Sequence, residues 1–209
     1  KAASIAGVFT TNAVAAAPVL VSRETVKNGV AHAVVANAGC ANACTGEVGM
    51  ANARKMAELA AKEVGCAANE VIVGSTGIIG VNLPMDKLEA GIKAAASELS
   101  TEGSRNAGNA IITTDTYSKT CTLEVEIGGK AVRFGAIAKG SGMIQPNMAT
   151  MLCYITTDAA ITSKMLQTAL SDIVEVSFNM ISVDGDMSTN DTVAVLANGL
   201  AGNAEITEK

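Results

Sequence analysis

The segment that most constrains this chain spans residues 139–158, where a loop of small and turn-forming residues leads directly into an unbroken apolar run. Two glycines and a proline mark the first half as a loop, and residues 151–155 are typical of a strand buried on both faces. Thr150 stands at the boundary, directly after the small residue Ala149. A β-branched residue with a nucleophilic oxygen at this position is suited to attack the preceding carbonyl, here that of Ala149.

The core has to be built almost entirely from aliphatic side chains. Aromatic residues make up 2% of the 209 residues and tryptophan is absent, while 49% of the residues are hydrophobic. Backbones must therefore approach closely for alanine, valine, isoleucine, leucine and methionine to fill the interior. The length allows one substantial core, and no linker or internal repeat divides it, so we expect one domain over residues 1–209.

Charge, hydropathy and cysteine content argue against several classes of protein. A net charge of -5, with 15 lysine and arginine residues spread along the chain, provides no basic patch for nucleic acid. The apolar runs are short and interrupted, so none approaches the roughly 20 residues that a membrane-spanning helix needs. Five cysteines, an odd number scattered in apolar surroundings, favour reduced thiols and a cytoplasmic location over a disulfide framework.

Hydrophobic periodicity predicts alternating strands and helices. Strands are predicted at residues 5–11, 19–22, 31–36, 70–73, 121–127, 131–137, 151–155 and 193–197. Helices are predicted at residues 47–64, from residue 84 or 86 with an apolar face that reaches Leu99, and from residue 162 or 163 to a point before residue 182. Residues 74–80 and the Gly128-Gly129 pair are predicted to be turns.

The sequence lacks the residues that would complete a histidine-dependent catalytic site or a cysteine-based zinc site. His32 is the single histidine, lies in a predicted apolar strand and has no carboxylate close to it in sequence, so a structural role is favoured over that of a catalytic base. Cys40 and Cys44 are four residues apart, but no second cysteine pair and no second histidine complete a zinc site. The cysteines are therefore interpreted as small hydrophobic residues.

Two further segments match ligand-binding motifs only in part. Residues 74–80 follow a strand and precede a helix, but Ser75 and Thr76 break the spacing of a dinucleotide-binding loop and no Walker lysine follows. This turn can still direct a backbone N–H and a hydroxyl at a developing negative charge. In residues 184–191, Thr189 stands where a calcium loop requires glycine, so a network of Asx turns is predicted there.

Hydroxyl chemistry without histidine remains. A threonine at a newly created N-terminus can use its own α-amine, with a pKa of about 8, as the general base. Thr150 is the one hydroxyl residue with the loop-to-strand context that this chemistry requires. A threonine that merely caps a strand is the alternative, and residue type alone favours that alternative.

The segment from Lys139 to Thr150, Lys-Gly-Ser-Gly-Met-Ile-Gln-Pro-Asn-Met-Ala-Thr, resembles the self-cleavage signature of the ornithine acetyltransferases, which are glutamate N-acetyltransferases of arginine biosynthesis. Other blocks similar to that family, in the family's order, are Ala6-Gly-Val-Phe-Thr-Thr-Asn12, Asn42-Ala-Cys-Thr-Gly46, Ser75-Thr-Gly77, Thr113-Thr-Asp-Thr116 and Ser182-Val-Asp-Gly-Asp-Met-Ser-Thr-Asn-Asp-Thr-Val193. The resemblance covers essentially the whole chain.

The resemblance implies an α/β fold, a layered αββα-type sandwich of the ornithine acetyltransferase and β-aminopeptidase kind. It also implies self-cleavage between Ala149 and Thr150, which gives an α-chain segment of residues 1–149 and a β-chain that starts with residues 150–209. Thr150 would then carry an acetyl group from N-acetylornithine to glutamate, with the Thr76 hydroxyl and the Gly77 N–H as the oxyanion hole.

The same resemblance assigns substrate contacts to Thr113 (or its neighbour Thr114), Lys139 and Thr150. A cation at Lys139 would also help to keep the new amine unprotonated. No metal and no cofactor is implied, although acetyl-CoA is an alternative acetyl donor. The expected assembly is an α/β heterodimer from one precursor that associates further.

Two departures from the family pattern bear on these expectations. The family's Asn-Ser-Gly-Asn-Ala-Asn block reads Asn37-Ala-Gly-Cys-Ala-Asn42 here, a change expected to tune packing. The chain also ends at Lys209, so we expect the C-terminal part of the β-chain to be absent. Two alternatives stay open: a hydrolase of the same superfamily, resembling the β-aminopeptidases, and a non-enzymatic ligand-binding module.

Overall fold

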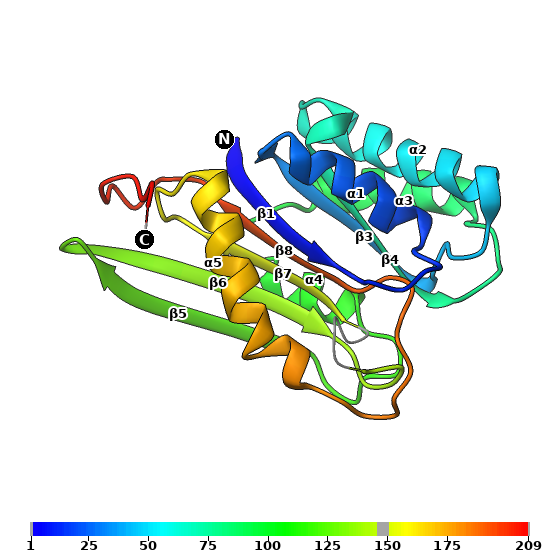
Figure 1. The fold of residues 1–209 in the computed structure, drawn as a ribbon. Helices are drawn as coiled ribbons and strands as arrows, with labels where there is room; N and C mark the ends of the chain where they lie inside the picture. Colours follow the sequence, from blue (N-terminus) through cyan, green and yellow to red (C-terminus); the bar gives the residue numbers. More distant parts are fainter. Residues whose placement is uncertain (1, 146–150, 209) are drawn as a thin grey trace.

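The computed structural model describes residues 2–145 and 151–208, and these residues form four layers (Figure 1). The strands are β1 (Ala3–Phe9), β2 (Val30–Ala31), β3 (Ala33–Cys40), β4 (Val71–Ile78), β5 (Lys119–Ile127), β6 (Lys130–Lys139), β7 (Leu152–Thr157) and β8 (Thr192–Ala197). The α-helices are α1 (Ala17–Lys27), α2 (Gly46–Val64), α3 (Met85–Ser97), α4 (Ser104–Ala110) and α5 (Ser163–Glu175).

The described strands form two sheets. The larger has six strands in the order β2-β1-β8-β7-β6-β5, in which β7 and β8 pair in parallel and the other neighbours pair antiparallel. The smaller consists of β3 and β4 in parallel. Helices α1, α2 and α3 cover one face of the small sheet, and α5 lies on the outer face of the large sheet (Figure 1).

Alternation along β4 shows why the sheets stack in this way. Val71 and Val73 belong to the cluster that packs against α1 and α2, whereas Ile72 belongs to the cluster between the two sheets. Because successive side chains of a strand point to opposite faces, one strand contributes to two layers of core. On α5, Leu166, Leu170 and Val174 recur every four residues and form the face buried against the large sheet. The αββα sandwich is thereby confirmed.

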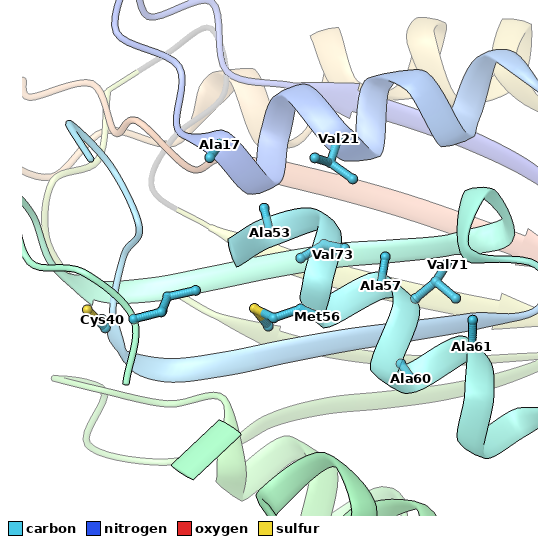
Figure 2. Packing of buried hydrophobic residues seen from close by; sticks show 11 residues of the cluster. Ala17, Val21, Cys40, Ala53, Met56, Ala57, Ala60, Ala61, Val71 and Val73 are labelled. Carbon is cyan, nitrogen blue, oxygen red and sulfur yellow. The ribbon is translucent and has the colours of Figure 1, made fainter. Parts of the chain in front are cut away.

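The expected aliphatic core is also confirmed, and alanine provides much of it. Ala53, Ala57, Ala60 and Ala61 of α2 are buried, and together with Met56 they face the valines of β4 (Figure 2). A methyl side chain lets a helix backbone lie close to the strands beneath it. At the end of the helix Val64 is exposed, although helical spacing from Met56 and Ala60 predicts it on the buried face.

The predicted strand at residues 19–22 is wrong, because these residues lie in helix α1. Pro18 occupies the first turn of the helix, where its missing N–H has no consequence. The buried face of α1 contains Ser22 and Thr25, whose hydroxyls donate hydrogen bonds to the carbonyls of Val73 (2.8 Å) and Val71 (3.2 Å). These buried hydroxyls hide the apolar period that indicates a helix.

The turn predicted at residues 74–80 is also wrong over most of its length, since β4 continues to Ile78. Its extension pairs with β3, in the register Gly39 with Gly77. Both glycines have positive φ angles, 107° and 129°, and a Cβ atom on Gly77 would lie 2.3 Å from the carbonyl carbon of Gly39. Glycine therefore serves here to extend a crowded parallel pair and not to reverse the chain.

The strand predicted at residues 31–36 is wrong in part, because β2 and β3 divide it between the two sheets. Helix α4 was not predicted, and the other elements differ from expectation only at their ends. The Gly128-Gly129 pair, with φ angles of 57° and 75°, connects β5 and β6 as a hairpin. Thr162 caps α5 by accepting a hydrogen bond from the Met165 N–H (3.3 Å). Helix α3 begins where predicted, but Leu99 lies beyond its end and is exposed.

Replacing Met56, which is fully buried between α2 and the small sheet, tests this packing. Met56→Ala should lower the free energy of unfolding by about 2–5 kcal/mol, because it removes buried methylenes and leaves a cavity. Met180→Ala, at an exposed methionine, is the control and should change it by less than about 0.5 kcal/mol. Urea unfolding measures both, and equal effects would contradict the assigned core.

Candidate active site

The candidate site lies between the two sheets, where the alternation of β4 and β6 brings Thr76 opposite Lys139. Thr76 follows Ile72 and Gly74 on the inward face of β4, and a Cβ atom on Gly74 would meet the Tyr154 hydroxyl of β7. Lys139 follows Ile137 on the inward face of β6. Lys139 Nζ donates a hydrogen bond of 2.9 Å to Thr76 Oγ1.

Burial gives Lys139 unusual electrostatics. Only 4% of its surface is exposed, and burial lowers the pKa of its amine because the charged form loses solvation. Negative charge on Asp115 or on Asp191 opposes this shift, and the Lys119 cation adds to it. Lys139 is thus a buried hydrogen-bond donor, and its partner is the hydroxyl oxygen of Thr76.

The segment of residues 113–116 is held against the loop that follows Lys139. Asp115 Oδ1 accepts hydrogen bonds from the Gly140 N–H (2.8 Å) and from Lys119 Nζ (2.5 Å). Burial opposes the ionisation of Asp115, but these hydrogen bonds outweigh it and lower the pKa of the carboxyl group. The Thr114 and Ser141 hydroxyls lie 2.7 Å apart. Two blocks 25 residues apart in sequence therefore meet directly after Lys139.

Asp191 is a site residue that sequence reasoning missed. It is fully buried directly before β8, and its Oδ1 accepts a hydrogen bond of 2.8 Å from the Met151 N–H directly before β7. Burial raises the pKa of this carboxyl group to about 8, although the Met151 N–H, Ser188 and Lys139 favour its charged form. Within the described ranges, Asp191 Oδ2 has no hydrogen-bond partner.

A small cavity joins these groups. It has a volume of about 10 Å³, near the lower limit for one water molecule, and its lining includes Thr76, Lys139, Met151 and Asp191. The hydroxyl of Thr76, the amine of Lys139 and the carboxyl group of Asp191 thus converge beside Met151. A much larger open groove of about 520 Å³ lies along β5, β6 and β7, and its lining includes none of these four residues.

The Asx network predicted for residues 184–191 is confirmed, and it holds the loop before the site. Asp184 accepts hydrogen bonds from the backbone N–H groups of Met143 (2.6 Å), Ile144 (2.8 Å) and Asp186 (3.3 Å). The hydrogen bonds from Met143 and Ile144 contribute most to lowering the pKa of Asp184. This segment therefore holds backbone on either side of residues 146–150 in sequence, through Asp184 bonded to Ile144 and Asp191 bonded to Met151.

The structure brings together some of the predicted site residues. Thr76, Gly77 and Lys139 lie at one end of the interface between the sheets, and Thr113 lies exposed in the segment held against Gly140. Ala149 and Thr150 lie outside the described residues, so the cleavage and nucleophile assignments stay predictions.

His32 and the cysteines lie apart from this cluster. His32 is exposed between β2 and β3, not within a buried strand, and its Nδ1 lies 3.1 Å from Glu70 Oε2. All five cysteines are free; Cys40 and Cys153 are buried as expected of small hydrophobic residues, but Cys44 and Cys121 are exposed. In the described part of the chain, no helix has the length and apolarity needed to cross a membrane.

Comparison with known proteins identifies this architecture. The ArgJ family model matches residues 1–209. The chain belongs to the ArgJ family. An ArgJ relative, the arginine biosynthesis bifunctional protein of Symbiobacterium thermophilum, is 58% identical over 201 residues, which cover 96% of this chain and 50% of the relative. The chain therefore spans about half the length of the curated relatives it matches.

Two crystal structures show the same relationship in three dimensions. ArgJ from Bacillus halodurans has a TM-score of 0.63 and 40% identity over 70% of this chain and 76% of its own. An ornithine acetyltransferase from Mycobacterium tuberculosis in complex with ornithine has a TM-score of 0.60 and 36% identity over 72% of this chain and 78% of its own. The fold described above is thus that of ArgJ proteins.

The raised pKa of Asp191 predicts a pH-dependent stability. An aspartate in an unfolded chain has a pKa of about 3.9, whereas that of Asp191 is raised to about 8. Between these values the native state binds more protons than the unfolded state, so the free energy of unfolding falls as pH rises, by at most about 1.4 kcal/mol per pH unit. Asp191→Asn removes this contribution.

Urea unfolding at several pH values from about 5 to about 7.5 measures the effect. The stability of Asp191→Asn relative to the parent should rise with pH across that range. Asp86→Asn, at an exposed position in the first turn of α3, is the matched control. A difference between Asp191→Asn and the parent that stays constant with pH would contradict the assigned protonation of Asp191.

Proposed function

We propose that the protein containing this chain transfers an acetyl group from N-acetylornithine to glutamate through an acetyl ester of Thr150. Membership of the ArgJ family supports this proposal, since a relative at 58% identity is named an arginine biosynthesis bifunctional protein. The related ornithine acetyltransferase from M. tuberculosis, crystallised with ornithine, supports the substrate class.

The hydrogen bond from Lys139 Nζ to Thr76 Oγ1 is the observation that carries it. Because Thr76 Oγ1 accepts this hydrogen bond, the hydrogen of the Thr76 hydroxyl points away from Lys139. Thr76 can therefore donate to an oxyanion without competition from Lys139 for that hydrogen. Burial at 6% exposure strengthens such a bond, because little water screens it.

The first reaction in the proposal is self-cleavage. Thr150 Oγ attacks the carbonyl carbon of Ala149, the peptide C–N bond breaks, and the proton lost by the hydroxyl passes to the nitrogen, which becomes the Thr150 α-amine. Water then hydrolyses the ester, which leaves the carboxyl terminus of Ala149 and the free hydroxyl of Thr150. The products are an α-chain ending at Ala149 and a β-chain beginning at Thr150, which we propose remain associated as a heterodimer and oligomerise further.

The second reaction uses the new terminus. The α-amine takes the proton of the Thr150 hydroxyl while Oγ attacks the acetyl carbonyl, and ornithine leaves with that proton on its nitrogen. The glutamate amine then attacks the acetyl ester, which restores the Thr150 hydroxyl and gives N-acetylglutamate. Thr76 and the Gly77 N–H stabilise the oxyanion formed in both steps.

The remaining roles follow from the same site. Thr113 or Thr114, in the segment bonded to Gly140, contacts the substrate together with Lys139. A cation at Lys139 also disfavours a second positive charge close by and so favours the neutral form of the amine. No cofactor is required, acetyl-CoA is an alternative acetyl donor, and the cytoplasm is the proposed location.

Mass spectrometry of the intact protein tests the cleavage step. The parent should give two chains that meet between Ala149 and Thr150, and Thr150→Ala should give one uncleaved chain because it lacks the attacking oxygen. Thr150→Ser keeps a hydroxyl and should still yield two chains. Cleavage of Thr150→Ala at this bond is the result that would refute the nucleophile assignment.

Replacing Thr76 tests the oxyanion role in acetyl transfer. Thr76→Val keeps the side-chain shape but removes the hydroxyl, and it should lower the rate of N-acetylglutamate formation from N-acetylornithine and glutamate by about 10²–10³-fold. Thr76→Ser should recover most of the activity. Ser75→Ala is the control and should keep acetyl transfer, because the Ser75 hydroxyl points to the other face of the small sheet and bonds to Asn37 of β3 (2.6 Å).

The same assay separates transfer from hydrolysis. Release of acetate without formation of N-acetylglutamate would contradict the proposal and favour a hydrolase of the same superfamily. An unreduced rate in Thr76→Val, with cleavage complete, would instead reject only the assigned oxyanion hole.

A further inference from the structure

Three side chains that commonly bind metals converge at the end of the small sheet opposite to Thr76. His32 precedes β3 and Glu70 precedes β4, whereas Thr76 and Gly77 lie near the other end of the β3–β4 pair. One ligand atom each from His32, Cys66 and Glu70 lies within 4.8 Å of the others. None of the three has a part in the acetyl transfer proposed above.

The backbones that carry these side chains are held in place. The His32 N–H donates a hydrogen bond of 2.8 Å to the Glu70 carbonyl. Cys66 follows Gly65, the left-handed residue that ends α2, and its own N–H donates to the Ala61 carbonyl (3.0 Å). The cluster therefore consists of one helix terminus and the starts of two paired strands, and little backbone ordering would remain to be done on binding a ligand.

The Glu70 carboxylate is also oriented. Its Oε2 accepts a hydrogen bond of 3.0 Å from the Ala67 N–H, and the same oxygen lies 3.1 Å from His32 Nδ1. With metal–ligand bonds of roughly 2.0–2.3 Å, two ligands of one tetrahedral ion lie roughly 3.2–3.8 Å apart. The His32–Glu70 separation is already close to that value, so only the Cys66 thiol needs to move closer.

The combination of donors indicates which ion fits. A thiolate, an imidazole and a carboxylate suit Zn²⁺, whereas Mg²⁺ and Ca²⁺ prefer oxygen donors alone. The side chains of His32 and Glu70 are 31% and 28% exposed, so water can reach a fourth position. This is the three-ligand, one-water arrangement of an open zinc site.

We propose that His32, Cys66 and Glu70 bind one Zn²⁺ ion, with water as the fourth ligand. On binding, the thiol proton of Cys66 is released to water, and His32 binds through the lone pair of Nδ1 with its one ring proton on Nε2. The ion joins the end of α2 to the start of both strands of the small sheet.

Cobalt substitution tests the site, since Co²⁺ occupies zinc sites and reports on its ligands by absorption. The reduced, metal-stripped full-length protein should develop a thiolate-to-cobalt charge-transfer band that saturates at one equivalent and disappears on addition of Zn²⁺. Cys66→Ser should abolish the band. His32→Ala and Glu70→Gln should weaken Co²⁺ binding by at least about tenfold, because even outer-shell partners of a metal contribute that much.

Two controls keep the result specific to this cluster. Cys121→Ser, which removes an exposed cysteine of β5, should leave the band unchanged. Zn²⁺ should raise the melting temperature of the parent and of Cys121→Ser but not that of Cys66→Ser.

The proposal is overturned if no thiolate band forms at saturating Co²⁺, as expected when His32 and Glu70 form only an ion pair. A band that persists in a folded Cys66→Ser variant overturns it as well, because the thiolate would then come from another cysteine. Neither result depends on acetyl transfer, so the function proposed for the opposite end of the sheet is tested separately.

Discussion

The close face-to-face packing of the two sheets is the constraint on which the rest of this structure depends. At Gly74 a side chain as small as one methyl group would collide with the Tyr154 hydroxyl of the opposite sheet. This close packing excludes water from the layer that contains Lys139 and Asp191, and burial accordingly lowers the pKa of the amine and raises that of the carboxyl group. The electrostatics of the candidate site thus follow from the packing of a core poor in aromatic side chains.

Elements with a clear period could be predicted from the sequence, and elements whose polar residues are buried could not. Helix α5 and the β5–β6 hairpin form where their apolar patterns predict them, although Leu123 of β5 and Ile173 of α5 are exposed. Helix α1 does not, because its buried hydroxyls of Ser22 and Thr25 bond to strand carbonyls that belong to a distant segment. The extension of β4 through Gly77 was equally hidden, since glycine usually marks a turn and here permits the close approach of Gly39.

The candidate site shows the same division. Resemblance to a family pointed to Thr76, Gly77 and Lys139, and the structure brings Thr76 and Lys139 into contact across 63 residues of sequence. Asp191 was interpreted only as part of a turn network, because its partner Met151 is 40 residues away and is a backbone N–H that no side-chain pattern reveals. Contacts to backbone groups of distant segments are the part of a site that spacing alone does not predict.

The strand order of the large sheet determines how a broken chain would behave. Strands β7 and β8 come from the segment that follows the proposed cleavage point, yet they lie between β1 and β6, which come from the segment before it. The two pieces are therefore interleaved, and separating them would require both flanking ladders of backbone hydrogen bonds to break together. Cutting one peptide bond removes a covalent connection but leaves the strand order and its hydrogen bonds unchanged. The sheet can therefore stay intact while the cut creates a new amino terminus.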